Sequence, residues 1–487
     1  MFFNSHFYIF IFLPLTALIY FFLNRFRFLL AGRLVLLVAS LVFYGWWHPA
    51  YVLLLLVSIG FNYLIGGALI SGLEGKKGLL SYFQLALGVG GNILLLAYFK
   101  YADFFITNVN LAGGLEIPLL QPLLPAGLSF FTLNQIGFLV DSWRGRIKEH
   151  HFLSYVQFVS FFPYILAGPI VRYGEVVPQL ARRRNSLFDY RNASEGVFLF
   201  FIGLFKKVVI ADSLAVWANQ GFDAAATLTF VEAWITSLSY TLQLYFDFSG
   251  YTDMAIGTAL IFNIKLPINF NSPYKSLNIQ EFWRSWHMTL GNFMRDYVYI
   301  PLGGSKVPEG HVLGNLMITF LLIGIWHGAG WTFIVWGCMH GAAMIVHRIW
   351  KRFDILIPRP IAWFLTFGFV NGAWIFFRAK DLGDATKVLK GMIGLNGFVL
   401  PRFMERLIRV FPIQGVSSGN SLSGINGNDT TFLVVSVVLL LSVLFSNSNR
   451  MAEGFKPDFT RLSFITVIAA LSILYLGKYS EFLYFRF

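Results

Sequence analysis

Long runs of apolar residues without a single charged side chain recur along this chain of 487 residues. A helix needs about 20 such residues to span the hydrocarbon core of a bilayer. Clean runs near that length predict membrane-spanning helices at 7–24, 34–48, 49–71, 78–99, 152–171, 361–377, 430–449 and 462–477. Less clean candidates lie at 118–140, 195–217, 233–246 and 254–264. The pattern predicts an all-α polytopic integral membrane protein with about 11–13 membrane segments, some of them re-entrant or interfacial.

Composition excludes most other fold classes. Only 13% of the residues are charged, 56% are hydrophobic, and the mean hydropathy is +0.65. A soluble domain carries about 25% charged residues, because its surface must be polar. A water-soluble globule, a disordered chain, a collagen and a coiled coil are therefore all excluded. The lone Cys338 rules out an intrachain disulfide and a cysteine-based zinc site, and no histidine spacing suggests another metal.

Basic residues predict the orientation of the chain in the membrane. The net charge is +13, but the cations form short clusters between apolar runs, as the positive-inside rule describes, and no nucleic-acid-binding motif occurs. Arg25, Arg27 and Arg33 follow the first apolar run, which is then a transmembrane helix with its N-terminus outside. The segment 172–191, with three consecutive arginines, is expected to lie on anionic lipid at the cytoplasmic surface. Residues 265–306 form an amphipathic segment that does not span the membrane, and 417–431 a flexible polar loop.

The stretch Val312–Val346 contains 35 residues without Asp, Glu, Lys or Arg. It is too long for one ordinary span, so we expect a broken helix, two short segments or a steep tilt. His327 lies near its centre, within the sequence GIWHGAGW, whose glycines permit a helix break and the close approach of a ligand. A neutral imidazole can accept a proton from a hydroxyl group and return it to a leaving group. The alternative is a histidine that is hydrogen-bonded between helices.

A second cluster occupies residues 281–290, with the sequence EFWRSWHMTL. At helical spacing, one stripe contains Trp283, Trp286, His287, Leu290 and Met294, and a neighbouring stripe contains Arg284, Met288, Gly291 and Arg295. Guanidinium groups bind phosphates in a bidentate manner, so this face suits a phosphorylated acyl donor such as coenzyme A. The alternative is an interfacial helix with tryptophan at headgroup depth and arginine on lipid phosphate, or arginines paired with Glu281 and Asp296.

Two further groups of polar residues are weaker candidates. Gln243, Asp247 and Asp253 would form a polar file through the membrane if the protein were a secondary transporter. His340 and His347 lie one heptad apart, and we expect both to serve packing.

Five motifs follow one another along most of the chain. They are PAGLSFFTLNQIGFLVDSWRG at 125–145, FFPYILAGPIVRY at 161–173, FDFSGYTDMAIG at 246–257, FNSPYKSLNIQEFWRSWHMTLGNFMRDYVYIPLGG at 270–304 and GIWHGAGWTFIVWGCMHG at 324–341. In order and spacing they resemble the membrane-bound O-acyltransferase (MBOAT) family, in its bacterial branch of alginate O-acetylation and teichoic-acid D-alanyl transfer proteins. The extended C-terminal part, with NGAWIFFRA at 371–379, is more similar to the polysaccharide-acetylating branch.

The resemblance implies one membrane domain over 1–487, a ring of helices around a central funnel or tunnel. Its N-terminal helices are at 1–117, its core with the active site at 118–350, and its C-terminal helices, with a polar loop near 414–430, at 351–487. His327 corresponds to the essential histidine of the family and His287 to its second active-site position. Together with the local pattern, this gives a set of donor-binding candidates: Trp283, Arg284, Trp286, Arg295, Asp296, Trp326 and Trp331.

The implied function is a multi-pass O-acetyltransferase of the bacterial inner membrane, with no bound cofactor and no metal. Acetyl from a cytoplasmic donor, expected to be acetyl-CoA, would pass across the membrane to an exported polysaccharide such as alginate. Teichoic acid, peptidoglycan and cellulose are alternative acceptors, and a transporter or a structural scaffold are alternative classes. Expected partners are membrane lipid, a periplasmic SGNH-type acetyltransferase and polysaccharide export machinery.

Overall fold

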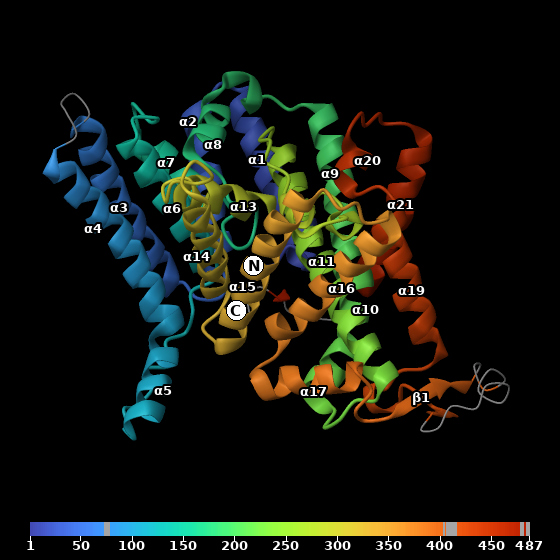
Figure 1. Cartoon of the computed structure of the whole chain (residues 1–487). Helices are drawn as coiled ribbons and strands as arrows, with labels where there is room; N and C mark the ends of the chain where they lie inside the picture. The colour runs from blue at the N-terminus through green and yellow to red at the C-terminus, as the bar shows by residue number, and fades with distance from the viewer. Residues whose placement is uncertain (73–77, 403–404, 406–415, 478–481, 484–487) are drawn as a thin grey trace. The chain divides into compact units, whose positions relative to one another are not determined.

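A computed structural model describes residues 1–72, 78–402, 405, 416–477 and 482–483. The contacts within the chain divide it into two compact units. Unit 1 comprises 1–204, 251–269 and 451–477, and unit 2 comprises 205–250, 270–450 and 478–487. Helix α11 (Phe230–Ile261) contributes residues to both units. The described residues are overwhelmingly helical, which confirms the predicted all-α class (Figure 1).

Unit 1 contains the N-terminal helices and the last helix of the chain. Its elements are η1 (Tyr8–Phe12), α1 (Leu13–Arg25), α2 (Leu29–Gly45), α3 (Ala50–Ser71), α4 (Leu79–Leu96), η3 (Ala97–Tyr101), α5 (Ala102–Gly113), α6 (Leu128–Trp143), α7 (Phe152–Ser160), α8 (Tyr173–Ala181), η4 (Arg183–Ser186), α9 (Tyr190–Phe205) and α21 (Phe459–Tyr475). Its core is aromatic: the rings of Tyr8, Phe12, Phe43 and Phe162 pack together, and Tyr8 Oη lies 3.0 Å from Thr258 Oγ1.

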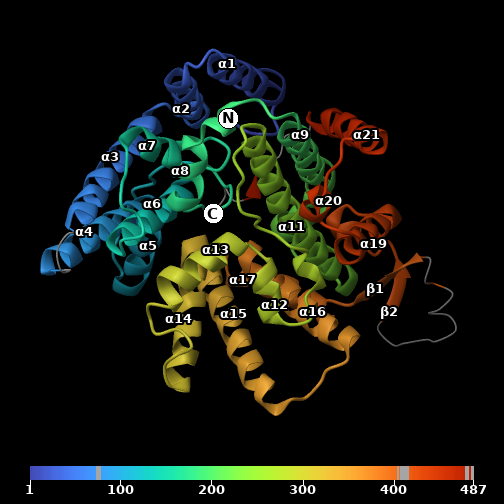
Figure 2. The same ribbon diagram turned by 90° about the horizontal axis from the view of Figure 1, so that it is seen from above.

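Unit 2 contains most of the helices between residues 205 and 450. Its elements are η5 (Lys206–Ala211), α10 (Asp212–Asn219), η6 (Gln220–Ala224), η7 (Pro273–Lys275), α12 (Ile279–Ser285), α13 (Met288–Met294), η8 (Arg295–Tyr299), α14 (Glu309–His327), α15 (Trp331–Trp350), η9 (Lys351–Phe353), α16 (Arg359–Arg378), α17 (Leu382–Met392), β1 (Phe398–Pro401), β2 (Val416–Gly419), η11 (Ser423–Ile425) and α19 (Asp429–Leu444). Helix α20 (Ser448–Ala452) contributes residues to both units. Figure 2 shows α14 and α15 side by side, with α12 and α13 along them.

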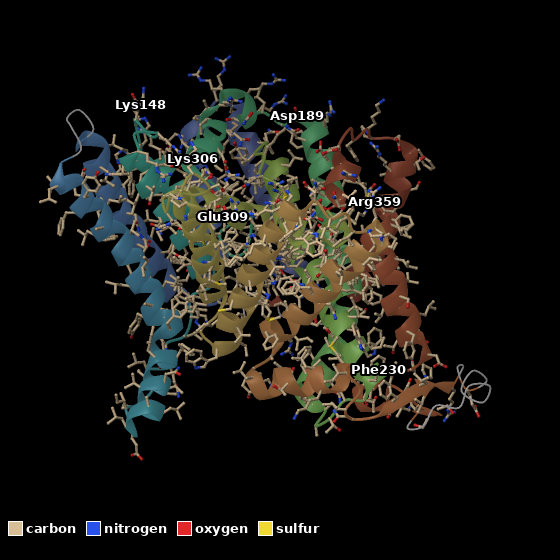
Figure 3. All side chains as sticks on the ribbon, viewed as in Figure 1. Lys148, Asp189, Phe230, Lys306, Glu309 and Arg359 are labelled. Atoms are coloured by element: carbon tan, nitrogen blue, oxygen red, sulfur yellow. The ribbon has the colours of Figure 1, made fainter. Side chains whose placement is uncertain are left out.

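Most of the clean apolar runs form helices where they were predicted. Five helices in the described part are long and apolar enough to cross a membrane: 8–25, 50–71, 79–113, 309–327 and 359–378. Shorter apolar helices occupy 29–45, 429–444 and 459–475. Many of their large apolar side chains, such as Leu18, Leu64 and Leu94, are exposed on the protein surface, as lipid contact requires. Figure 3 shows side chains that project outward from the ribbon of α4.

The predicted span at 152–171 is wrong. Only α7, nine residues long, is helical, and the chain from Phe161 to Val171 is buried without regular structure. Pro163 and Pro169 explain the difference, because proline removes a backbone donor and restricts the residue before it.

The polar stretch 417–431 has more structure than the expected loop. It contains most of β2, which pairs in parallel with β1 in the register Phe398 to Val416, and the short helix η11. Leu422 and Ile425 are buried, and Asn428 caps α19 by accepting a hydrogen bond from the Thr431 amide. The parallel strand pair was not predicted.

Candidate active site

The long uncharged stretch folds as a helical hairpin. Helix α14 ends at His327, and α15 begins at Trp331 after Gly328–Gly330. Of the three expected arrangements, two helices with a turn is the observed one. The glycines serve the packing of the hairpin: a Cβ atom on Gly324 would lie 2.5 Å from Phe333 O and 3.1 Å from Gly337 Cα. The backbones of α14 and α15 therefore approach closely, as small residues permit between membrane helices.

His287 lies at a break between two short helices, not within one continuous helix. Helix α12 ends at Ser285 and α13 begins at Met288, so the predicted single helix is wrong. The backbone of His287 has φ = +41°, in the left-handed region that non-glycine residues rarely adopt. Such a conformation costs on the order of 1–3 kcal/mol and is concentrated at functional sites. The break turns the imidazole toward the end of α14.

The structure brings the two histidines together. Their ring centroids are 6.4 Å apart with an angle of 58° between the ring planes, and their exposed fractions are 1% (His287) and 3% (His327). Trp326 contacts both rings, at 6.1 Å from His287 and 4.8 Å from His327. The two histidines predicted to be catalytic therefore lie close together, while their chemical roles stay predictions.

An aromatic wall adjoins the histidine pair. Trp336 and Phe377 pack on the His327 ring at 5.3 and 5.0 Å. Trp336 in turn contacts Trp283 at 5.8 Å. Trp283 is held in place because its Nε1 donates a hydrogen bond to His340 Nδ1 at 3.2 Å. His340 was expected to serve packing only, but its hydrogen bond also orients the indole ring of Trp283.

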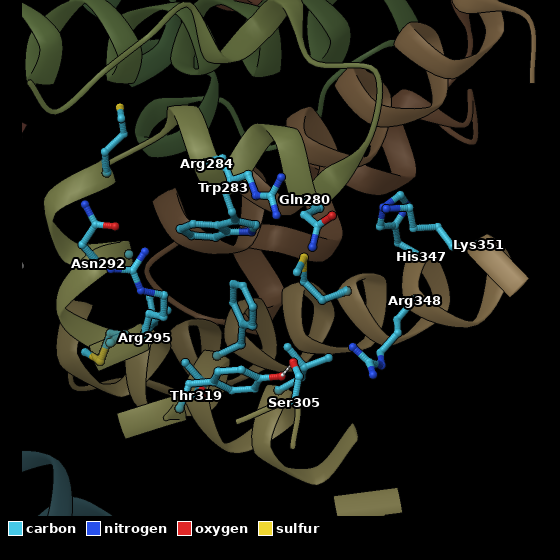
Figure 4. Close-up of a pocket in the computed structure, with 18 residues that line it drawn as sticks. Gln280, Trp283, Arg284, Asn292, Arg295, Ser305, Thr319, His347, Arg348 and Lys351 are labelled. Atoms are coloured by element: carbon cyan, nitrogen blue, oxygen red, sulfur yellow. Dashed lines mark hydrogen bonds between the residues drawn. The ribbon is translucent and has the colours of Figure 1, made fainter. Parts of the chain in front are cut away.

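A cavity of about 500 Å³ opens on the other side of Trp283. Figure 4 shows side chains from α12, α13 and η8 facing those of α14 and α15 around it. Its lining comprises Gln280, Trp283, Arg284, Met288, Gly291, Asn292, Met294, Arg295, Tyr299, Ser305, Leu316, Thr319, Phe320, Ile323, Met344, His347, Arg348 and Lys351. All four residues of the predicted arginine stripe line the cavity, although the helix that was to carry them is broken.

The cationic side chains of the cavity differ in their partners. Arg295 forms a bidentate pair with Asp296, at 2.6 and 3.1 Å, and Arg348 pairs with Glu309 at 2.8 Å. The Arg284 guanidinium makes no ion pair or hydrogen bond with any residue that the structure describes. Glu281 does not pair with it, since its carboxylate accepts hydrogen bonds from Leu277 N and Asn278 Nδ2. Internal pairing thus holds for Arg295 and not for Arg284.

The remaining candidates occupy other positions. Trp286 is buried against Trp374 at 4.9 Å, and neither Trp286 nor Trp326 lines the cavity. Trp331 begins α15 and is 56% exposed, also outside the cavity lining. Conversely, Arg348 and Lys351 line the cavity although the sequence did not identify them as candidates. His347, which was expected to serve packing, lines the cavity as well.

The proposed polar file through the membrane has a different environment. Asp247 forms an ion pair with Lys207 at 2.7 Å, and Lys207 also pairs with Asp212 at 2.9 Å. All three side chains are buried, so both ion pairs of Lys207 lie inside the protein. Within the described ranges, no three His, Cys, Asp or Glu side chains form a group suited to a metal ion.

Comparison with known proteins identifies the family of this site. Residues 119–378, which include both histidines and the cavity, match the model of the membrane-bound O-acyltransferase family. The chain belongs to the membrane-bound O-acyltransferase family. It is 44% identical to the peptidoglycan O-acetyltransferase of Helicobacter pylori, over all of this chain and 97% of the relative. It is 40% identical to the probable alginate O-acetylase AlgI of Azotobacter vinelandii, over 82% of this chain and 79% of the relative.

A more distant relative has a different acyl group in its name. The teichoic acid D-alanyltransferase of Bacillus subtilis is 30% identical over 47% of this chain and 60% of its own length. The MBOAT chain described here is thus an O-acyltransferase and a multi-pass membrane protein. The transporter alternative is overturned, because relatives along the whole chain are acyl-transfer enzymes.

Proposed function

We propose that this MBOAT protein transfers acetyl groups from cytoplasmic acetyl-CoA across the inner membrane to a cell-envelope polysaccharide, with peptidoglycan as the acceptor. The proposal rests on one observation: a cavity lined by basic and aromatic side chains lies near a buried pair of histidines. The whole-length relative at 44% identity supports peptidoglycan over alginate as the first acceptor to test. Alginate stays the second candidate, because of the relatives at 40% identity and below.

The cavity suits the polar part of the donor. Coenzyme A carries phosphates, an adenine ring and a flexible pantetheine arm. Arg284 and Lys351 supply cations for the phosphates, and Trp283 and Tyr299 supply aromatic surfaces. The thioester would then extend past Trp283 toward the histidines. For this, the side chains of Trp336 and Phe377, which form the aromatic wall, must change position.

The histidine pair suits acyl transfer. His327 takes the proton of an acceptor hydroxyl as that oxygen attacks the acetyl carbonyl carbon, and returns it to the coenzyme A sulfur as the C–S bond breaks. The imidazolium formed in this step lies at the carboxyl end of α14, where the helix dipole stabilises positive charge. His287 is placed to bind the reacting carbonyl oxygen or to orient the acceptor, since its ring lies 6.4 Å from that of His327.

The acetylated acceptor at this site need not be the final polymer. We propose that a periplasmic SGNH-type acetyltransferase and the polysaccharide export machinery complete the transfer. The decisive experiment uses the purified full-length chain in detergent with acetyl-CoA, and follows thiol release. A second measurement compares ester-linked acetate on peptidoglycan and on exopolysaccharide in cells with and without the gene. If no acceptor fraction leads to thiol release, acetyl-CoA is not the donor. If ester-linked acetate on peptidoglycan is the same in cells with and without the gene, peptidoglycan is not the acceptor.

A further inference from the structure

A second cavity, of about 540 Å³, lies in unit 1 and is distinct from the donor cavity of unit 2. It is bounded by the start of α9 and by the start of α21, which lie near each other in both views (Figures 1 and 2). Its volume is within the range of about 300–1,000 Å³ of small-molecule sites. Most of its lining is apolar: Phe188, Val197, Phe198, Phe455, Phe459, Leu462 and Ile465.

Helix α21 packs loosely at this place. Of its 17 described residues, only Ser472 is buried, while Phe459, Leu462 and Leu474 are largely exposed. Its attachment near the cavity is a small cluster of Phe198, Ile202 and Phe455 on which Ile465 packs. An apolar ligand bound between two loosely packed helices adds dispersion contacts to both, and so stabilises the pair.

The rim of the cavity carries one charge of each sign. Asp458 caps α21, because its Oδ1 accepts a hydrogen bond from the Arg461 amide at 2.8 Å. The Arg461 guanidinium lies 5.3 Å from the Phe455 ring, and its Nη1 donates to the carbonyls of Gly454 and Lys456. Asp458 Oδ2, and Nε and Nη2 of Arg461, have no hydrogen-bond partner among the described residues.

We propose that this cavity binds one bilayer phospholipid with a zwitterionic headgroup that carries a primary ammonium group. An acyl chain fills the apolar part, where each buried CH₂ contributes roughly 0.8 kcal/mol. Arg461 binds the phosphate and Asp458 the ammonium group. The two charged lining residues have no net charge, and neither has a zwitterionic headgroup. An anionic headgroup could pair with Arg461, but it would bring no ammonium group for the carboxylate of Asp458.

Two variants test the headgroup and the chain separately. Asp458→Asn removes the negative charge but keeps an N-cap residue, so α21 should fold normally. Its matched control is Asp381→Asn, since Asp381 caps α17 in the same way, far from the cavity in sequence. Ala193→Phe places a ring in the cavity lining, and its control is Ala112→Phe on the exposed surface of α5.

The measurement is native mass spectrometry of the full chain in detergent with equimolar phosphatidylethanolamine and phosphatidylglycerol. The wild type should retain one phosphatidylethanolamine in about two- to fivefold preference, the range of one exposed ion pair. Asp458→Asn should lose the preference, Ala193→Phe should lose the bound lipid, and both controls should behave as the wild type. Equal retention of the two lipids by the wild type, or unchanged retention in Ala193→Phe, overturns the proposal.

Discussion

Removing the positive charge of Arg284 gives a direct test of the donor cavity. Arg284 lines the cavity and has no ionic partner among the described residues, so its charge is available to a phosphate. The substitution Arg284→Gln keeps a polar side chain of similar length. A hydrogen bond between charged groups contributes about 1.5–3 kcal/mol. Arg284 is exposed, however, so solvent screening reduces the effect to about 1 kcal/mol, which corresponds to roughly a fivefold increase in KM.

The assay measures thiol release from acetyl-CoA at several donor concentrations. A phosphate contact binds the donor equally well in the ground state and in the transition state. Its loss therefore raises KM and leaves kcat nearly unchanged, because the histidine pair keeps its geometry. Raising the ionic strength should increase the KM of the wild type more than that of the variant. Arg359→Gln, an exposed arginine at the start of α16, is the control. A normal KM in Arg284→Gln, or a loss confined to kcat, would refute phosphate binding by this residue.

Three further substitutions test other parts of the structure. His327→Ala should lower kcat about 10²–10⁴-fold while size-exclusion profiles stay normal, and wild-type activity would contradict the proton-transfer role. Gly324→Val should reduce folded yield, because its side chain meets the backbone of α15; an unchanged melting temperature would show that the hairpin can separate at no cost. Asp223 pairs with Arg378 at 2.6 Å, and although burial raises the pKa of Asp223, hydrogen bonds and charges from Arg378 and Lys380 hold it below its usual range. The pair therefore stabilises the fold above about pH 4 and ceases to do so as pH falls through the lowered pKa, so Asp223→Asn should lower the melting temperature at pH 7 and not at acidic pH.

Uninterrupted apolar runs were sufficient to predict most of the long helices. Helices α3 and α16 begin and end within two residues of the predicted spans, and η1 and α1 together cover 8–25 where 7–24 was predicted. The same reasoning failed at 152–171, where composition is apolar but two prolines interrupt the backbone. High hydropathy indicates that a segment avoids water and not that it is helical, and residues 161–171 are buried in the protein without being helical.

The active-site residues illustrate a different limit. The glycine-flanked His327 was recognisable from sequence, since an ionisable side chain in a long apolar stretch is costly unless it has a function. The break at His287 was not, because neither proline nor glycine lies between Ser285 and Met288. The break coincides with a tertiary contact that local sequence does not reveal, since Trp286 is fully buried against Trp374. Likewise, Arg348 and Lys351 reach the cavity from α15 and the turn after it, a contact that local spacing cannot reveal.

The cavity and the histidine pair have different surroundings. Arg284, Arg295, Arg348 and Lys351 line the cavity beside Trp283, whereas the rings of Trp326, Trp336 and Phe377 pack on His327. Under the proposed function, phosphate recognition would rest on partly exposed cations, and proton transfer would take place where burial strengthens each electrostatic interaction. Because Trp283 belongs to both the cavity lining and the aromatic wall, and is oriented by His340, its position links the two parts. The proposal therefore predicts different kinetic signatures: substitution of Arg284 acts on KM, and substitution of His327 acts on kcat.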